Sequence, residues 1–251
     1  MDLDLKGRVA FVTGGGAGIG EAIAGALAKE GCIVAVADRD RAAAERAAAS
    51  IARDGHPAHP IAVDVGDDSA VEKAFAAIGK IGAPSILVNA AGLLSLGAVA
   101  DCPAGEFNRV ARVNVDGIVH CVRAAVPAMR AARSGRIVNI ASISAMRGGG
   151  SVGNTLYGAT KAAVVALTMG LARELGPSGI TVNAVAPAIV DTAMTHAALT
   201  EEARRRILPR IPLGRFATTA DIANVVAFLA SERASFITGA VIPVDGGILT
   251  T

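Results

Sequence analysis

The chain has 251 residues, of which 52% are hydrophobic and 18% charged, and its formal net charge is +2. So small a charge provides no basic face for nucleic acid, and the local cluster at residues 204–206 follows two glutamates, as on a solvated helix face. The most apolar helical run, residues 162–172, is too short to span a bilayer, and residues 1–5 lack a signal-peptide pattern. We therefore expect a soluble cytoplasmic protein that binds neither nucleic acid nor a membrane.

Chain length and cysteine usage predict one reduced domain. A chain of this length commonly forms a single α/β domain, so we expect one domain over residues 1–251. The cysteines at positions 32, 102 and 121 are odd in number and lack the spacing of metal ligands. We expect them to be buried small hydrophobic residues, and we expect no metal site.

The first strong pattern is a strand, a glycine loop and a helix. Residues 8–13 are apolar and end in glycines, as a buried parallel strand does. The loop GGGAGIG at residues 14–20 follows, and then the helical pattern of Ile23 and Leu27 begins. Glycines let backbone N–H groups approach a pyrophosphate, and a helix N-terminus favours negative charge. No register of the loop satisfies G-x-G-x-x-G, so this pattern alone is weak support for nucleotide binding.

A second apolar run, residues 32–37, ends in Asp38, which lies 18 residues after Gly20. A carboxylate in this place accepts hydrogen bonds from an adenosine ribose. The alternative is that Asp38 caps the alanine-rich helix that follows. Together, the glycine loop and Asp38 favour nucleotide binding.

Strands and helices go on alternating along the chain. We expect helices at residues 40–53, 67–81, 106–132, 154–175 and 219–231, and strands at 59–63, 85–89, 136–141, 179–185 and 240–244. Asp64 and the stretch from Asn89 to Gly92 follow strand ends, where ligands bind in doubly wound sheets. Residues 188–213 show no clear strand or single helix and are typical of a lid. The pattern predicts a Rossmann-like doubly wound fold, with a seven-stranded, mostly parallel sheet covered by helices on both faces.

The helix expected from residue 154 carries the only tyrosine of the chain, Tyr157, with Lys161 four positions later. Such a pair lies on one helix face. A positive charge about 4 Å from the phenol, in an effective dielectric near 20, is worth roughly 4 kcal/mol, or about 3 pKa units. We therefore expect a lowered phenol pKa, suited to a general acid or base. Alone, the pair is more typical of an ordinary helix with a buried tyrosine and a solvated lysine.

With these residues in place, the chain resembles the short-chain dehydrogenase/reductase family over residues 6–247. The motifs that carry the resemblance are TGxxxGIG at 13–20, Asp64-Val65, NAAG at 89–92, Asn114, Ser142, Tyr157-x-x-x-Lys161, Asn183-x-x-x-Pro187 and VDGG at 244–247. The resemblance implies hydride transfer between a nicotinamide and an alcohol or carbonyl carbon. It makes Tyr157 the acid/base, Ser142 the partner of the substrate oxygen, Asn114 a water-relay residue and Lys161 the residue that holds the nicotinamide ribose.

The resemblance also implies a cofactor site. Its expected residues are Gly14, Gly16, Ala17, Gly18, Ile19, Asp38, Arg39, Asp64, Val65, Asn89, Ala90, Gly92, Tyr157, Lys161, Pro187, Val190 and Thr192. We expect NAD as the cofactor because Asp38 would repel the 2′-phosphate of NADP, and because Ala17 stands where NADPH users often have Arg or Lys. Arg39 weakens this preference. The family commonly has glycine where this chain has Ala188, so the backbone beside the nicotinamide is expected to differ.

The substrate site is the least patterned part of the chain. The resemblance points to Ser142, Ser144, Leu94, Ser95, Met146, Asn154, Tyr157, Ala188, Met194 and His196, with His196 more typical of a surface helix. This lining is largely apolar and has no arginine to clamp an acid, which favours a small uncharged secondary alcohol or ketone. The usual family spacing before Tyr157 points to Ser144, whereas the strand register from Arg136 points to Ser142. We assign Ser142 as catalytic because the glycines at 148–150 can absorb the extra length.

Two other functions remain open. One is a 3-oxoacyl-[acyl-carrier-protein] reductase that uses NADPH. Such reductases tend to present two basic residues to the acidic carrier protein. Here Arg133 matches one of these residues, but Ser178 stands at the position of the other. The other open function is a non-catalytic NAD(H)-sensing protein. For assembly, the helix after Tyr157 is apolar nearly all round, which predicts a partner subunit. The resemblance implies a homotetramer, with residues 244–251 in a second interface.

Overall fold

The computed structural model describes residues 2–150 and 152–250, so Met1, Ser151 and Thr251 of the expected domain lie outside the described residues. Its strands form one seven-stranded sheet in the order β3-β2-β1-β4-β5-β6-β7. The strands are β1 (Val9–Thr13), β2 (Ile33–Asp38), β3 (Ala58–Ala62), β4 (Ile86–Asn89), β5 (Gly135–Ile140), β6 (Ile180–Pro187) and β7 (Val241–Val244). All neighbouring strands are parallel, which confirms the predicted doubly wound α/β fold.

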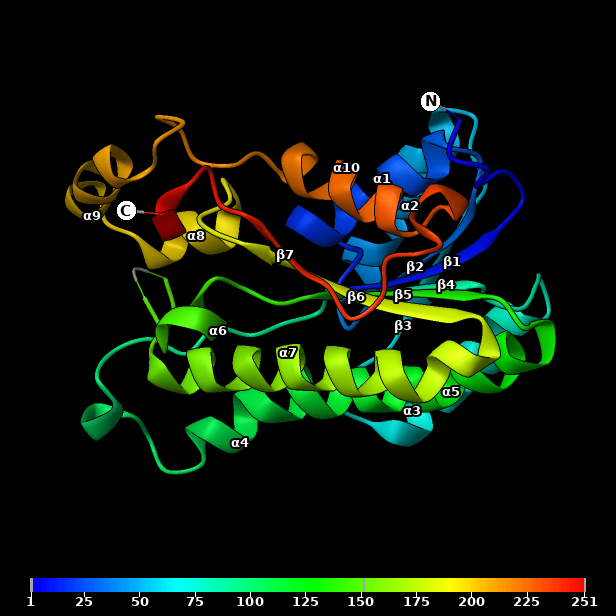
Figure 1. The fold of residues 1–251 in the computed structure, drawn as a ribbon, viewed down its shortest axis with the longest axis horizontal. Coiled ribbons are helices and arrows are strands. Elements are labelled where there is room, and N and C mark those ends of the chain that lie inside the picture. Colours follow the sequence, from blue (N-terminus) through cyan, green and yellow to red (C-terminus); the bar gives the residue numbers. More distant parts are fainter. Residues whose placement is uncertain (1, 151, 251) are drawn as a thin grey trace.

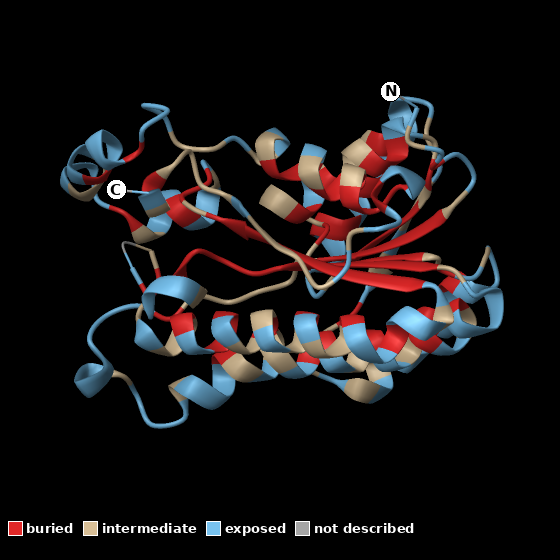
Figure 2. Cartoon of the chain, viewed as in Figure 1, coloured by how far each residue is buried: buried red, intermediate tan, exposed pale blue. Residues whose placement is uncertain are grey.

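Helices cover both faces of the sheet (Figure 1). One face carries α1 (Gly18–Lys29), α2 (Arg41–Arg53) and α10 (Thr219–Leu229), and the other carries α3 (Asp68–Gly79), α4 (Glu106–Ala111), α5 (Gly117–Ala132) and α7 (Thr155–Leu175). Two apolar cores lie between the sheet and these layers. The edge strands β3 and β7 have no buried residue. Figure 2 shows that the strands between them are buried almost throughout, while the helices are buried only on the side that faces the sheet. This burial explains why the strands read as continuous apolar runs.

The strand order reverses between β1 and β4, because the chain first builds β2 and β3 on one side of β1 and then crosses to the other. Ligands bind at such a switch point, beyond the carboxyl ends of the strands. Here the Thr13 hydroxyl accepts hydrogen bonds from Ala90 N at 3.0 Å and from Ala91 N at 3.1 Å. This contact fixes the loop after β4 against the loop after β1.

The predicted helix over residues 106–132 is interrupted. A π-helical segment, Arg112–Asp116, separates α4 from α5 and contains Asn114. Extra residues of this kind commonly mark functional sites in helices. The apolar periodicity continues through the segment, so a single helix was the natural interpretation of the sequence.

The segment expected as a lid holds two short helices, α8 (Ala193–Ala198) and α9 (Glu201–Ile207). Another short helix, α6 (Ser144–Arg147), follows β5, and 3-10 turns lie at Val99–Asp101, Gly176–Ser178, Leu208–Arg210, Glu232–Ala234 and Ile248–Thr250. A third small apolar cluster fastens the lid through Ile189, Ile207, Ile211 and Ile248. Residues 188–213 therefore cover the carboxyl end of the sheet (Figure 1).

Among the described residues, Thr155–Ser178 is the one helical stretch long and apolar enough to cross a membrane, with a hydropathy of 1.3. The stretch exceeds the apolar run seen in the sequence because helical structure continues into polar residues at both ends. Val164, Thr168 and Ala172 of α7 are buried beneath the sheet. A core helix of this kind meets the same length and composition criteria.

Candidate active site

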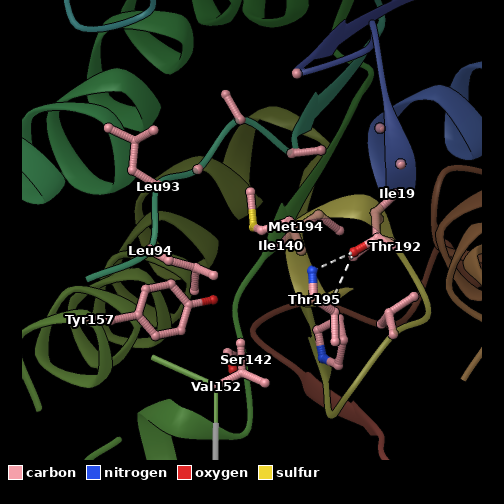
Figure 3. Close-up of a pocket in the computed structure, with 18 of the residues that line it drawn as sticks. Ile19, Leu93, Leu94, Ile140, Ser142, Val152, Tyr157, Thr192, Met194 and Thr195 are labelled. Atoms are coloured by element: carbon pink, nitrogen blue, oxygen red, sulfur yellow. Dashed lines mark hydrogen bonds between the residues drawn. The ribbon is translucent and has the colours of Figure 1, made fainter. Parts of the chain in front are cut away.

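A cavity of about 500 Å³ lies at the carboxyl ends of the strands, beneath the lid. All the predicted cofactor residues line it except Gly16 and Asn89, and so do Ser142, Ser144, Leu94, Ala188 and Met194 of the predicted substrate site. Asn114, Ser95, Met146, Asn154 and His196 do not line it. Figure 3 shows Tyr157, Ser142, Leu94 and Val152 on one side of the cavity and Ile19, Thr192 and Thr195 on the other.

The glycine loop at residues 14–20 can adopt its conformation only without side chains at two positions. Gly14 has a φ of +63°, and a Cβ there would lie 2.8 Å from Ala91 Cα. A Cβ on Gly20 would lie 2.1 Å from the carbonyl oxygen of Gly14. The loop thereby packs closely against the start of α1, where Gly18, Ile19 and Gly20 line the cavity. The N-terminus of a helix favours the binding of negative charge.

Asp38 lies at the end of β2 and holds two backbone N–H groups. Its Oδ2 accepts from Gly16 N at 3.0 Å, and its Oδ1 accepts from Asp40 N at 3.0 Å. The helix cap is instead Asp40, which accepts from Ala43 N at 3.1 Å, so the alternative role for Asp38 is wrong. Gly16 packs against Asp38 so closely that a Cβ on Gly16 would come 2.9 Å from Asp38 Oδ2. Gly16 itself does not line the cavity.

Asp64 and Val65 line the cavity next to Asp38. Asp64 accepts from Gly66 N at 2.9 Å and forms an ion pair with Arg112. Arg112 belongs to the same π-helical segment as Asn114, so the pair ties the loop after β3 to that segment.

Tyr157, Ser142 and Lys161 meet at the other end of the cavity. Burial raises the pKa of Tyr157 to about 12, and a hydrogen bond with the Ser142 hydroxyl opposes this rise. Burial lowers the pKa of Lys161 to about 8. The ammonium donates to the carbonyl oxygen of Ile140 at 2.7 Å and lies 5.8 Å from the centroid of the Tyr157 ring.

These contacts correct the sequence-based expectation for the phenol. Lys161 sits over the ring and is turned towards Ile140, so it does not offset the desolvation of the phenol. Desolvation favours the neutral form of both groups, which moves the two pKa values in opposite directions. In this structure Tyr157 therefore keeps its proton at neutral pH, as a general acid must.

The two serines that the sequence left in competition occupy different places. Ser142 lies two residues after the end of β5, and its hydroxyl forms a hydrogen bond with the phenol of Tyr157. Ser144 begins α6, and its N–H donates to Ser142 Oγ at 3.1 Å. Helix α6 and the glycines that follow it separate Ser142 from Tyr157, and the assignment of Ser142 as catalytic stays a prediction.

The three asparagines of the prediction have side chains with internal partners. Asn114 donates to Thr160 Oγ1 and to Leu93 O, each at 3.0 Å, and accepts from Leu93 N at 2.8 Å. Asn89 donates to Asn139 Oδ1 at 2.8 Å in the core. Asn154 caps α7 and lies behind the substrate wall. These side chains hold the site together from behind the cavity surface.

The sequence-based prediction missed some residues that line the cavity. Leu93, Ile143 and Val152 add apolar surface, and the first two adjoin motifs that could have pointed to them. Arg147 also lines the cavity, at the end of α6, with an exposed side chain. The expectation of a lining without arginine is therefore wrong, because a run that reads as an irregular loop forms a helical turn there. Met146, on the same turn, is exposed outside the cavity.

Comparison with known proteins agrees with this geometry. A family model described as enoyl-(acyl carrier protein) reductase matches residues 14–249, nearly the whole chain. The meso-2,3-butanediol dehydrogenase of Serratia marcescens is 41% identical over 241 residues, covering 96% of this chain and 94% of that protein. The chain belongs to the short-chain dehydrogenase/reductase family.

Relatives within this family differ in substrate. The 3-oxoacyl-[acyl-carrier-protein] reductase of Pseudomonas aeruginosa is 38% identical over 247 residues, covering 98% of this chain and 99% of that protein. A crystal structure of a provisionally named NAD(P)-dependent gluconate 5-dehydrogenase from Beutenbergia cavernae, with bound NADP at low occupancy, superposes with a TM-score of 0.94. It is 38% identical, and the match covers 100% of both chains. The family relationship makes the protein an oxidoreductase that binds a nicotinamide cofactor.

The cavity fits such a cofactor. Its length runs from Asp38 and Asp64, past the glycine loop and the start of α1, to Tyr157 and Lys161. A side chain on Gly14 would clash with Ala91, and one on Gly20 would clash with the carbonyl oxygen of Gly14, so only glycine fits at these two positions of the loop. Among residues 2–150 and 152–250, no cluster of three or more His, Cys, Asp or Glu side chains could hold a metal ion.

Proposed function

We propose that this protein transfers a hydride between NAD(H) and a small, uncharged, largely apolar secondary alcohol or ketone. The observation that carries the proposal is one cavity with Asp38 at one end and Tyr157, Ser142 and Lys161 at the other. The first end suits an adenosine ribose with free hydroxyls, and the second suits proton transfer to or from a carbinol oxygen.

The chain's own residues handle the proton and the substrate oxygen. Tyr157 donates its proton to the oxygen in reduction and takes it back in oxidation, while Ser142 holds that oxygen by a hydrogen bond. Lys161, on the same helix face, binds the ribose next to the nicotinamide. When bound, the nicotinamide would supply or accept the hydride, and the positive charge of its oxidised form would favour loss of the Tyr157 proton.

The choice of NAD over NADP rests on Asp38. Its carboxylate lines the cavity, and both of its oxygens are engaged by backbone N–H groups. A 2′-phosphate there would face a like charge held in place. Arg39 also lines the cavity and would pair with such a phosphate, so we expect a preference for NAD of about tenfold rather than an absolute one.

The substrate class rests on the wall opposite the cofactor loop. Leu93, Leu94 and Val152 give it an apolar surface (Figure 3), and Ile143 and Met194 add to the apolar lining of the cavity. Apolar walls with few polar groups bind neutral molecules of matching shape. Arg147 is an exposed charge at this cavity and is the feature of the wall that favours a substrate with an acidic group.

We further propose a cytoplasmic homotetramer of one-domain subunits, each with residues 188–213 as a lid. The outward face of α7 carries Ala159, Ala162, Ala166 and Met169, which are exposed although apolar. An apolar helix face of this kind is typical of a subunit interface. Light scattering at micromolar concentration tests this proposal, and a monomeric mass would contradict it.

The second candidate is a 3-oxoacyl-[acyl-carrier-protein] reductase. The relative from Pseudomonas aeruginosa is almost as similar to this chain as the butanediol dehydrogenase. Reduction of a carrier-linked 3-oxoacyl group with NADPH, faster than any free ketone is reduced with NADH, would favour it over our proposal.

A substrate panel tests the proposal directly. We would follow NADH absorbance with neutral vicinal diols and ketones, with hydroxy acids of the same carbon skeleton, and with a 3-oxoacyl thioester. Our proposal predicts the highest kcat/KM for a neutral compound with NAD(H). A preferred hydroxy acid whose advantage disappears in Arg147→Ala would contradict the neutral substrate class. Cofactor binding without turnover on the whole panel would favour the sensor.

A further inference from the structure

Residues 93–96 form a segment of the cavity wall, and each of its backbone carbonyl oxygens accepts a hydrogen bond from a residue outside the segment. Leu93 and Leu94 line the cavity, and Ser95 and Leu96 continue the segment away from it. Its four carbonyl oxygens accept hydrogen bonds, respectively, from Asn114 Nδ2 at 3.0 Å, Arg109 at 2.8 Å, Asn154 N at 2.8 Å and Asn154 Nδ2 at 3.3 Å. Loops usually leave such groups to water. The wall is therefore a fixed surface.

Asn154 connects this wall to the start of α7. Its Nδ2 also donates to Ser95 Oγ at 3.0 Å, and Ser95 is only 1% exposed. Its Oδ1 accepts from the backbone N–H of Tyr157 at 3.1 Å, which caps the helix. One side chain thus joins the wall to the backbone of the tyrosine.

A second connection reaches the other backbone group of Tyr157. The Thr160 hydroxyl donates to the Tyr157 carbonyl oxygen at 2.8 Å and accepts from Asn114 Nδ2 at 3.0 Å. Asn114 holds both the N–H and the carbonyl of Leu93. Thr160 and Asn114 are 1% and 0% exposed, so water does not compete for these bonds.

We propose that Asn154 and Thr160 are positioning residues that fix the Leu93–Leu94 wall at a set distance from Tyr157, so that the substrate is selected by a rigid template. This rests on the proposed function. Hydride transfer needs a carbinol carbon held within a narrow range, and small misplacements of a reactant cost large factors in rate. A template tied to both backbone groups of the tyrosine places the substrate against the wall and its oxygen at the phenol together.

Asn154→Asp separates the two roles of Asn154. Aspartate keeps the oxygen that caps α7 but lacks the N–H groups that reach Ser95 and Leu96. Asn154→Ser repeats the change without adding charge. We expect both variants to keep the melting temperature and the NADH affinity of the parent protein. We expect kcat/KM for the best substrate to fall about tenfold, and the discrimination against a larger, branched analogue to shrink. Unchanged discrimination in both would overturn the proposal.

Helix α7 offers a matched control for Thr160. Thr168 is also buried, donates to Val164 O at 2.7 Å and accepts from Asn139 Nδ2 at 3.0 Å, but its partners lie away from Tyr157. Thr160→Val and Thr168→Val therefore remove equivalent hydrogen bonds. We expect similar losses of melting temperature, with kcat and discrimination reduced only in Thr160→Val and restored in Thr160→Ser. Equal kinetic losses in both valine variants would mean that Thr160 has a merely structural role.

Hydrogen exchange supplies a readout that does not need activity. Amides of residues 93–96 should exchange faster in Asn154→Asp than in the parent protein, while those of residues 157–160 stay protected. Unchanged exchange at 93–96 would overturn the proposed tie even if the enzyme has another substrate. Conversely, a parent protein that turns over nothing would refute the proposed function while leaving this measurement of the tie in force.

Discussion

The two ends of the cavity are built by different means. At the nucleotide end, the shape comes mainly from the backbone: Gly14 packs on Ala91, Gly20 packs on Gly14, and Asp38 accepts from two N–H groups. At the catalytic end, buried side chains hold one another, as Asn114 holds Thr160 and Asn154 holds the wall. The first end depends on glycines that pack closely beside the Asp38 carboxylate, whereas the second depends on the hydrogen-bond partners of each buried side chain.

This difference predicts how each end responds to substitution. A change at the catalytic end should remove chemistry while the nucleotide still binds, and a change at the nucleotide end should alter cofactor choice while the chemistry persists. The following substitutions test this separation in order of decreasing effect.

Tyr157→Phe should have the largest effect. It removes the proton donor and keeps the ring, so kcat should fall by about 10³-fold, within the range typical of general acid–base catalysis. NADH affinity, measured by fluorescence titration, should stay close to that of the parent protein. Residual activity near the parent level would show that another group moves the proton.

Ser142→Ala should follow, with a loss of about 10²-fold in kcat, the scale seen when one donor to a reacting oxygen is removed. Ser144→Ala should act mainly on KM, because its hydroxyl lines the cavity at the start of α6. Steady-state kinetics of both variants distinguish the two serines. The reverse pattern would place the catalytic hydroxyl at Ser144.

Asp38→Ala tests the nucleotide end. Loss of the carboxylate should narrow the preference for NAD over NADP by about tenfold, which corresponds to roughly 1.4 kcal/mol. The ratio of kcat/KM with the two cofactors measures this effect, and kcat with saturating NAD should change little. A parent protein that already prefers NADPH would contradict the assignment.

Lys161 should affect stability through pH. Burial lowers its pKa to about 8 from the ordinary value of 10.5, so between these values the unfolded chain binds more protons than the folded one. Stability should therefore rise with pH in this window, by on the order of 1 kcal/mol from pH 8 to 9. Urea unfolding of the parent protein and Lys161→Met at both pH values isolates the contribution. The same slope in both proteins would show that Lys161 is not the titrating group.

The sequence predicted most of the fold because buried parallel strands read as apolar runs and glycines mark the nucleotide loop. It also placed Tyr157 and Lys161 on one helix face, and it placed Asp38 and Ser142 at the carboxyl ends of strands. It could not predict the phenol pKa, because the direction in which the Lys161 ammonium points depends on the Ile140 carbonyl. The wall segment at 93–96 was equally hidden, because its partners come from residues far apart in the chain, Arg109, Asn114 and Asn154.

The most direct test of the account follows the hydride itself. The substrate would be a neutral secondary alcohol that the panel identifies, deuterated at the carbinol carbon. It would be incubated with NAD⁺ and the protein, and the mass of the reduced cofactor would be measured by mass spectrometry. We predict NADH heavier by one mass unit, formed by the parent protein and about 10³-fold more slowly by Tyr157→Phe. Reduced cofactor without the label, or tight NAD⁺ binding with no reduced cofactor at all, would contradict the account.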